Sequence, residues 1–494
     1  MQQRYDFTIV GGGINGCSLA RELSGRGHKV LLLEKNDLGS ATSSASTKLL
    51  HGGLRYLENY EFSMVRKSLL ERDYLVERLP HIAWPMTFTL PFDKKLRSEF
   101  MLRAGLGLYN MLAGNLSKIW VSPRSMTPQT DPFIGDNFNL GFDYQDAWVD
   151  DSRLVFLCAR HAADMGADIK TRSCFVSSKP HNGSWHVCYQ TADQEEVEVY
   201  SKFLINASGG WVSDNAEQIE RRDFEKNVSW VRGSHLIIKR SLDHAYIFQL
   251  ADKRIMFALP YEQHFALLGT TDVTHHSALD AVHCSKEERQ YILDGMNLFF
   301  AQPIMEDEIC HDFAGVRTLM HQKGKNNSTA SRDYEFHISD QNGSICLHVI
   351  GGKITTFRRL ALDAIKQLSQ HTKLTKIDGP WIKDETFPGA GYHPSQKNDL
   401  RQQIVGRYSF LPLTLVDRMM RQQGMRVFDI FGDASCIEDI GDLMVGDLSL
   451  REIDYLQHNE WAYTSEDILY RRTKQYLQAT QNAKMSLKKY LGED

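Results

Sequence analysis

The stretch "TIVGGGINGCSLA" (residues 8–20) decides the fold of the first part of this 494-residue chain. Three glycines, Gly11, Gly13 and Gly16, separate an apolar run from a helix-like run, and a second apolar run, "KVLLLE", ends at Glu34. This order predicts a strand, a glycine turn, a helix and a second strand. In that context the glycines permit a tight turn, close approach to a pyrophosphate and close helix–strand packing, while Glu34 can bind a ribose hydroxyl. The stretch therefore predicts a dinucleotide site, and the acidic Glu34 disfavours NADP.

The composition is that of a globular protein of two or three domains, with 42% hydrophobic and 24% charged residues. A net charge of −5 gives no reason to expect nucleic acid as a partner. The eight cysteines form no CxxC pair, which favours a reducing compartment. The first strand is reached by Phe7, too early for a signal peptide, and no apolar run approaches the ~20 residues of a membrane span.

The rest of the chain continues the alternation of strands and helices. Strand-like runs fill 170–206 and 228–272, and the strand "SICLHVI" (344–350) enters a second glycine turn, "GGKITT", and a helix. Past about residue 385 the chain becomes charged and helical. The pattern predicts an α/β fold followed by a helical region.

The stretch "GSATSSASTKLLHGGLRYLE" (39–58) separates FAD from NAD, because its hydroxyl residues and second glycine pair have no place in a nicotinamide site. Here the chain resembles the FAD-dependent glycerol-3-phosphate dehydrogenases, within the D-amino-acid-oxidase-like flavoproteins. The resemblance runs from the first strand to the C-terminal helices. It is also carried by "YQDAWVDDSRLV" (144–155), "INASGGWV" (205–212), "RGSHLII" (232–238), "LLGTTDV" (267–273), "AGVRTL" (314–319) and "GGKITTFRRLA" (351–361).

The resemblance implies a Rossmann-like FAD-binding domain over 1–384, with interleaved antiparallel-sheet substrate segments at about 75–145 and 221–325. A C-terminal helical domain follows over 385–494. Within it, "EDILYRRTKQYL" (466–477) places Ile468, Leu469 and Arg472 near one helical face, which favours packing against the flavin domain.

The resemblance also implies non-covalent FAD and a set of contacts to it. On composition alone the serine run would be an exposed loop, and the family match reverses that preference. One departure stands out: the family's "NATGPW" is here "NASGGW" (206–211), which keeps a hydroxyl and loosens the turn. The predicted cofactor residues are Gly11, Gly13, Asn15, Gly16, Glu34, Ser43, Ser44, Lys48, Leu49, His51, Gly52, Gly53, Gly209, Gly352, Thr355 and Thr356.

A phosphorylated polyol needs cations at one end and an acid–base group beside the reacting carbon. The planar guanidinium suits phosphate oxygens, and lysine adds a point charge. His235 has a ring suited to accept a hydroxyl proton, although a hydrogen-bonded structural histidine is the competing interpretation. The predicted catalytic residues are His235 and Arg317, and the predicted substrate-binding residues are Arg55, Tyr56, Arg332 and Lys353.

The predicted reaction is hydride transfer from C2 of sn-glycerol 3-phosphate to FAD, giving dihydroxyacetone phosphate, with electrons passed to a membrane quinone. The alternatives are an oxidase that uses O₂, or another amine or hydroxy-acid oxidase of the superfamily. A non-catalytic flavin-binding protein is an alternative of another class. No metal is expected, because His275, His276, His283 and Cys284 lack the spacing of a zinc site.

Use of a quinone without a membrane span implies docking on the bilayer surface. Residues 93–120 combine lysines and arginines with apolar side chains in a helical pattern that suits the headgroup level, and 484–491 is a weaker second candidate. The same apolar side chains could instead pack as core. The resemblance implies a homodimer, peripheral on the cytoplasmic face of the bacterial inner membrane.

Overall fold

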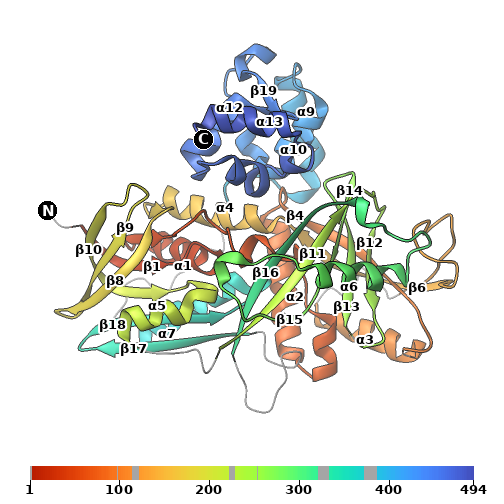
Figure 1. Cartoon of the computed structure of the whole chain (residues 1–494), viewed down its shortest axis with the longest axis horizontal. Helices are drawn as coiled ribbons and strands as arrows, with labels where there is room; N and C mark the ends of the chain where they lie inside the picture. The colour runs from red at the N-terminus through yellow and green to blue at the C-terminus, as the bar shows by residue number, and fades with distance from the viewer. Residues whose placement is uncertain are drawn as a thin grey trace.

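The computed structural model describes residues 3–96, 98–113, 122–221, 228–252, 254–320, 333–371 and 386–493. Two large sheets lie next to each other, and the C-terminal helices form a third unit above them (Figure 1).

The first sheet contains the strands of the glycine turn. Its centre is β1 (Arg4–Val10), which pairs in parallel with β2 (Val30–Leu33) on one side and with β10 (Glu196–Asn206) on the other. Two more parallel strands complete its centre, β7 (Asp168–Lys170) beside β2 and β18 (Ser344–Gly351) beside β10. Three antiparallel strands are added at two places: β17 (Tyr334–Gln341) pairs with β18, while β9 (Ser184–Gln190) pairs with β10 and with β8 (Cys174–His181).

Both faces of this sheet are covered, which explains the continuous apolar run of β2. Leu32 packs in the core on the side of three helices, whereas Leu31 and Leu33 pack on the other side with Trp185. The helices on the first side are α1 (Ile14–Gly25), α4 (Asp151–Asp164) and α7 (Phe357–His371), and α5 (Val212–Glu220) lies on the second.

The second sheet is almost entirely antiparallel, with one parallel pair between β12 and β4. Its strands alternate along the chain with those of the first sheet. They are β3 (Leu49–Leu50), β4 (Ala83–Pro91), β5 (Ser122–Ser125), β6 (Leu140–Val149), β11 (Val228–Ile238), β12 (Ala245–Gln249), β13 (Ile255–Tyr261), β14 (Phe265–Gly269), β15 (Val273–Thr274) and β16 (Ile309–Met320). The helices packed against it are α2 (Phe62–Arg78), α3 (Glu99–Leu112) and α6 (Lys286–Asn297).

The C-terminal unit is helical and rests on α4 (Figure 1). It has its own apolar cores, one around Leu415 and Phe431 and one around Leu456 and Ile468. Its helices are α9 (Lys397–Arg407), α10 (Leu413–Gln423), α11 (Val427–Phe431), α12 (Leu450–Glu460), a π-helix (Asp467–Arg472) and α13 (Gln481–Leu491), with a small hairpin of β19 (Leu443–Val445) and β20 (Leu448–Ser449).

The predicted fold class is therefore confirmed: a Rossmann-like α/β domain, an interleaved antiparallel sheet and a C-terminal helical region. Within the described ranges, no helix combines the length and apolar character that crossing a bilayer requires.

Candidate functional site

A cavity of about 560 Å³ lies where the carboxyl ends of β1 and β2 meet the second sheet. Parallel strands of an open sheet place ligands at their carboxyl ends, so the glycine turn faces this space. Val10 and Leu33 line it from the first sheet, and Gly233 and Thr318 line it from the second.

The glycines of the turn have separate structural tasks. Gly11 has a φ of +111°, and a side-chain carbon there would lie 2.6 Å from the carbonyl oxygen of Ala207. At Gly16 such a carbon would lie 1.9 Å from the carbonyl oxygen of Gly11, so only glycine lets α1 start this close to the turn. Gly13 has an ordinary backbone, and its open side faces the cavity, with only Ser43 Oγ near, at 3.1 Å.

Glu34 shapes the turn from the end of β2. Its carboxylate accepts hydrogen bonds from the amides of Gly12, at 2.7 Å, and Asn36, at 2.8 Å. Burial raises the pKa of Glu34, and the two amides oppose that shift by stabilising the charged form. The side chain lines the cavity, as a ribose-binding acid should.

Asn15 connects the two glycine turns and fits a dinucleotide. Its Nδ2 donates to the carbonyl oxygen of Gly351 at 3.0 Å. Its Oδ1 is buried and has no hydrogen-bond partner among the described residues, although Asn15 lines the cavity. Buried polar atoms are normally paired, so this acceptor suits a group that enters the cavity.

The departure at "NASGGW" has a local counterpart in the structure. The Ser208 hydroxyl donates to Asn206 Oδ1 at 2.6 Å, and Gly209 takes a φ of +60°. A side-chain carbon at Gly210 would lie 2.7 Å from Leu279 Cδ1. Glycine at this position therefore leaves room for the segment around Leu279 to pack on the turn.

Most of residues 39–47, the hydroxyl-rich loop, line the cavity, but Lys48 does not. Ser43 Oγ accepts from the Ile14 amide at the start of α1, at 3.0 Å. Lys48 is 3% exposed, and its ammonium donates to Asp151 Oδ1 at 2.7 Å and to the Ser44 carbonyl oxygen at 3.1 Å. Lys48 and Ser44 line an adjoining cavity of about 650 Å³ next to the C-terminal unit.

A buried polar network holds the "HGG" turn (51–53) in place. The Gly52 amide donates to the Tyr109 hydroxyl at 2.7 Å, and that hydroxyl donates to Asp146 at 2.9 Å. Arg72 pairs with Asp146 at 2.9 Å. Burial raises the pKa of Asp146 to about 6.

The structure brings most of the predicted site residues to the cavity at the carboxyl ends of β1 and β2. Those that line it are Gly11, Gly13, Asn15, Glu34, Ser43, Leu49, His51, Tyr56, Gly209, Arg317, Gly352, Lys353 and Thr355. Those that do not are Gly16, Ser44, Lys48, Gly52, Gly53, His235 and Thr356. Arg332 and the side chain of Arg55 lie outside the described part of the chain.

Cationic and aromatic side chains gather beside the second glycine turn. Lys353 Nζ lies 4.0 Å from the centre of the Tyr56 ring and 3.2 Å from Met64 Sδ. The Arg317 side chain is 31% exposed, with a nitrogen 4.0 Å from Asp272. This end of the cavity therefore presents two cations from β16 and the β18–α7 turn.

His235 lies next to this end of the cavity but does not line it. It is fully buried, and its Nε2 lies 2.9 Å from the Thr47 hydroxyl, while its ring stacks on Phe313 at 4.9 Å. Burial, with help from the charges of Arg317 and Lys48, holds the pKa of His235 well below its ordinary value, so the ring is neutral. Thr47 lines the cavity and separates His235 from it.

Other lining residues carry no motif that sequence reasoning could have used. They come from the start of β8 and from α5, which the fold brings to the first glycine turn, and they are Ser173, Cys174, Phe175, Asp214, Asn215 and Gln218. Among the described residues, no group of three or more histidine, cysteine or carboxylate side chains is placed to hold a metal ion.

Comparison with known proteins agrees with this geometry. The family model described as FAD dependent oxidoreductase matches residues 6–358. D-erythritol 1-phosphate dehydrogenase of Brucella abortus is 40% identical over 482 residues, covering 96% of this chain and 95% of that protein. Glycerol-3-phosphate dehydrogenase of Pseudomonas aeruginosa is 38% identical over 490 residues, covering 99% and 95%.

A solved structure shows the same fold. The glycerol-3-phosphate dehydrogenase of Bacillus halodurans, complexed with FAD, superposes with a TM-score of 0.79 at 22% identity, covering 99% of this chain and 90% of that one. The predicted flavoprotein class is thereby confirmed, and the glycine turns, Glu34 and Asn15 form a cradle that fits FAD. The chain belongs to the FAD dependent oxidoreductase family, in the group that contains glycerol-3-phosphate and D-erythritol 1-phosphate dehydrogenases.

Proposed function

We propose that this enzyme oxidises a polyol phosphate, with sn-glycerol 3-phosphate as the first candidate. The observation that carries the proposal is the position of Arg317 and Lys353 at one end of the FAD cavity, beside Tyr56 and His51. Two cations at a partly open site suit the oxygens of a phosphate. Binding of the phosphate, which does not react, would hold the carbinol carbon in place for reaction.

In the proposed reaction, the secondary alcohol at C2 becomes a ketone, giving dihydroxyacetone phosphate. Bound FAD supplies the acceptor for the hydride that leaves C2. Arg317 and Lys353 bind the phosphate, and Tyr56 forms a wall against which Lys353 is held. The hydroxyl proton passes to a base of the chain as the C=O bond forms.

Two histidines compete for the role of base. His51 lines the cavity directly, whereas His235 reaches it only through the Thr47 hydroxyl. The depressed pKa of His235 makes it a weak base, although a neutral ring is the form that accepts a proton. We favour His51 for direct proton transfer and assign His235 to positioning Thr47.

A second substrate candidate comes from the relatives. D-erythritol 1-phosphate dehydrogenase is as similar to this chain as the glycerol-3-phosphate dehydrogenases are, at 40% and 38% identity. Erythritol 1-phosphate carries the same phosphate and one more carbinol group. The same cationic end would bind either compound.

The test is the absorbance of the bound flavin under anaerobic conditions. Glycerol 3-phosphate, erythritol 1-phosphate and unphosphorylated glycerol are each added, and the rate of bleaching is measured. The proposal expects fast bleaching by at least one phosphorylated polyol and at least 10²-fold slower bleaching by glycerol, since the phosphate contacts are lost. Equal rates with glycerol would contradict the phosphate site.

Replacement of Arg317 by Ala tests the cationic end. We expect kcat/KM for the phosphorylated substrate to fall by about 10²–10⁴-fold, with kcat and KM both affected, because an oriented charge contact is lost. The flavin spectrum should stay near that of the wild type, since Arg317 is not part of the glycine cradle. An unchanged kcat/KM would remove Arg317 from the site.

The acceptor of the electrons is proposed to be a quinone. The competing oxidase reaction, with O₂, is measured on the same reduced enzyme: stopped-flow reoxidation by a water-soluble quinone analogue should be much faster than reoxidation by air-saturated buffer. Faster reaction with O₂ would make the enzyme an oxidase.

Quinone use implies contact with a bilayer, and α3 offers a surface for it. Phe100, Met101 and Met111 are 82%, 59% and 56% exposed, and Arg103 is also exposed. Leu106, one of the apolar side chains of residues 93–120 for which both membrane contact and core packing were open, is 1% exposed and packs in the core. The proposed location is the cytoplasmic face of the inner membrane, as a peripheral homodimer, and fractionation and sedimentation test these two points.

A further inference from the structure

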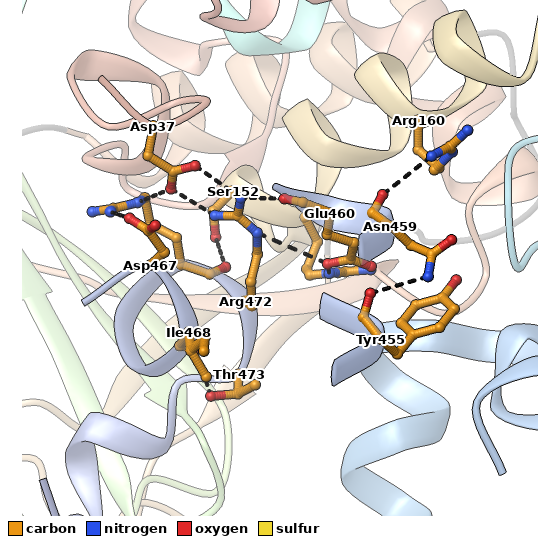
Figure 2. A network of polar contacts seen from close by, with 12 residues as sticks. Asp37, Ser152, Arg160, Tyr455, Asn459, Glu460, Asp467, Ile468, Arg472 and Thr473 are labelled. Carbon is orange, nitrogen blue, oxygen red and sulfur yellow. Dashed lines mark hydrogen bonds and ion pairs between the residues drawn. The ribbon is translucent and has the colours of Figure 1, made fainter. Parts of the chain in front are cut away.

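The C-terminal unit contacts the loop that follows β2. Asp37 lies on this loop, three residues after Glu34, and is 3% exposed. Its carboxylate accepts from Arg472 at 2.6 and 2.8 Å and from Arg471 Nε at 2.5 Å (Figure 2). Arg472 is itself fully buried. Two arginines of one domain therefore hold a single buried carboxylate of another.

A second contact reaches the same loop through Arg172. The Arg172 amide donates to the carbonyl oxygen of Asn36 at 3.0 Å, while its guanidinium donates to Asp467. Asp467 is 1% exposed and also accepts from the amides of Tyr463 and Thr464, each at 2.9 Å. The π-helix of the C-terminal unit thus fixes the loop at two neighbouring residues.

The other side of this loop supports the FAD turn. The Gly39 amide donates to the Gly12 carbonyl oxygen at 3.0 Å, and Glu34 accepts from the Gly12 amide at 2.7 Å. Leu38 packs against Gly12, because a side-chain carbon added at Gly12 would lie 2.8 Å from Leu38 Cδ2. Residues 34–39 therefore join the C-terminal arginines to the backbone that approaches the pyrophosphate.

The C-terminal unit itself does not reach the cofactor. Of the described residues, none beyond Thr355 lines the FAD cavity. The unit also touches the second sheet, where Tyr470 and Tyr476 lie against the ring of His311. The 34–39 loop is the contact that leads directly to the backbone of the first glycine turn.

We propose that Arg471 and Arg472 are positioning residues for FAD: through Asp37 they hold the 34–39 loop in the shape that binds the cofactor. Arginine's rigid fork fixes a carboxylate in both position and orientation, which a single surface charge would not do. FAD binding and docking of the C-terminal unit are then thermodynamically linked, so that each stabilises the other.

A matched control separates positioning from general stability. Arg418 and Glu452 form another buried pair, at 2.7 Å for each of two hydrogen bonds, inside the C-terminal unit. Glu452 is fully buried and neither residue contacts the 34–39 loop. Loss of this pair weakens the same unit without removing any of the hydrogen bonds that Arg471 and Arg472 donate to Asp37.

The experiment measures release of FAD from holoenzyme after dilution, followed by the fluorescence of free flavin, together with the thermal midpoint of each variant. Asp37→Asn and Arg472→Lys should each release FAD at least 10-fold faster than the wild type, and the double variant should be no faster than the worse single one. Glu452→Gln should lower the thermal midpoint at least as much and release FAD within twofold of the wild-type rate.

Two results would overturn the proposal: release rates that follow the thermal midpoint across all variants, or wild-type release from Asp37→Asn. If Arg472→Lys does not fold, Arg172→Lys tests the second contact, because its side chain is 24% exposed and tolerates change; it should also release FAD faster. The readout does not involve a substrate, so it is independent of which polyol phosphate the enzyme oxidises.

Discussion

At the scale of single residues, the three glycines of the first turn differ in how well each would tolerate an added side chain. A side chain added at Gly16 would overlap the Gly11 carbonyl oxygen, and Gly11 has a positive φ, so both positions need glycine for the backbone to form this turn. Gly13 has a φ of −78° and free space on its cavity side, so glycine at this position leaves room for the ligand. A substitution at Gly13 should therefore separate folding from binding.

We expect Gly13→Val to give a folded protein without FAD, because the added branches occupy the space of the pyrophosphate. Gly16→Ala should lose stability by about 3 kcal/mol or more, because its added carbon overlaps a backbone oxygen. Circular dichroism and the flavin absorbance of the purified proteins check both. Normal flavin content in Gly13→Val would contradict the assignment of the turn to FAD.

At the scale of elements, α3 shows how one helix can serve two environments. Leu102, Leu106 and Tyr109 face the core, while Phe100 and Met111 are exposed. Helix α3 itself lies at the opposite end of the view from the C-terminal unit (Figure 1). The burial pattern follows the helical period, so the apolar run is partly core and partly surface. The core interpretation of residues 93–120 therefore holds for Leu102, Leu106 and Tyr109, the membrane interpretation stays a prediction for Phe100 and Met111, and residues 97 and 114–120 lie outside the described part of the chain.

We expect Phe100→Ser with Met111→Ser to release the enzyme from anionic liposomes while its thermal stability stays within about 0.5 kcal/mol, as for exposed sites. Leu106→Ser is the core control and should cost about 2–5 kcal/mol. Co-sedimentation and thermal unfolding give the two readouts. Unchanged liposome binding by the double variant would place any membrane contact elsewhere.

At the scale of the whole molecule, two buried histidines lie where the C-terminal unit meets the flavin domain. His81 is fully buried beside the turns at Gly389 and Gly424, and His161 accepts from Arg21 at 2.9 Å next to Phe387. Burial, aided by nearby arginines, lowers the pKa of each histidine to about 3. Both rings stay neutral in the folded state, whereas they gain a proton below about pH 6.5 when unfolded.

The unfolded state therefore binds more protons between about pH 3 and 6.5, and stability falls as the pH falls through that window. From pH 7 to 5.5 each histidine should cost about 1 kcal/mol of unfolding free energy. Urea unfolding of the wild type and of His161→Gln at the two pH values isolates one histidine, since groups common to both proteins cancel. One such group is Asp146, whose raised pKa acts in the opposite direction. An identical pH dependence in both proteins would contradict the prediction.

The sequence by itself determined the first sheet, the glycine turn and the flavin class. The strands and the turn depend on local patterns, since the apolar runs of β1 and β2, three glycines at fixed spacing and Glu34 all lie within 30 residues of one another. The flavin class depends on the stretch at 39–58 and on the family resemblance that it carries. Most of the predicted cavity residues follow from the same motifs, because a motif carries its own backbone geometry.

Only the tertiary structure decided which charged groups meet. The ammonium of Lys48 pairs with Asp151 instead of facing the cavity, Leu106 is core, and His235 lies behind Thr47. Asp37 and Arg472 are 435 residues apart. A local sequence pattern cannot predict such pairings. A charged side chain is compatible with solvent or with any partner that the packing of distant elements brings within about 3 Å.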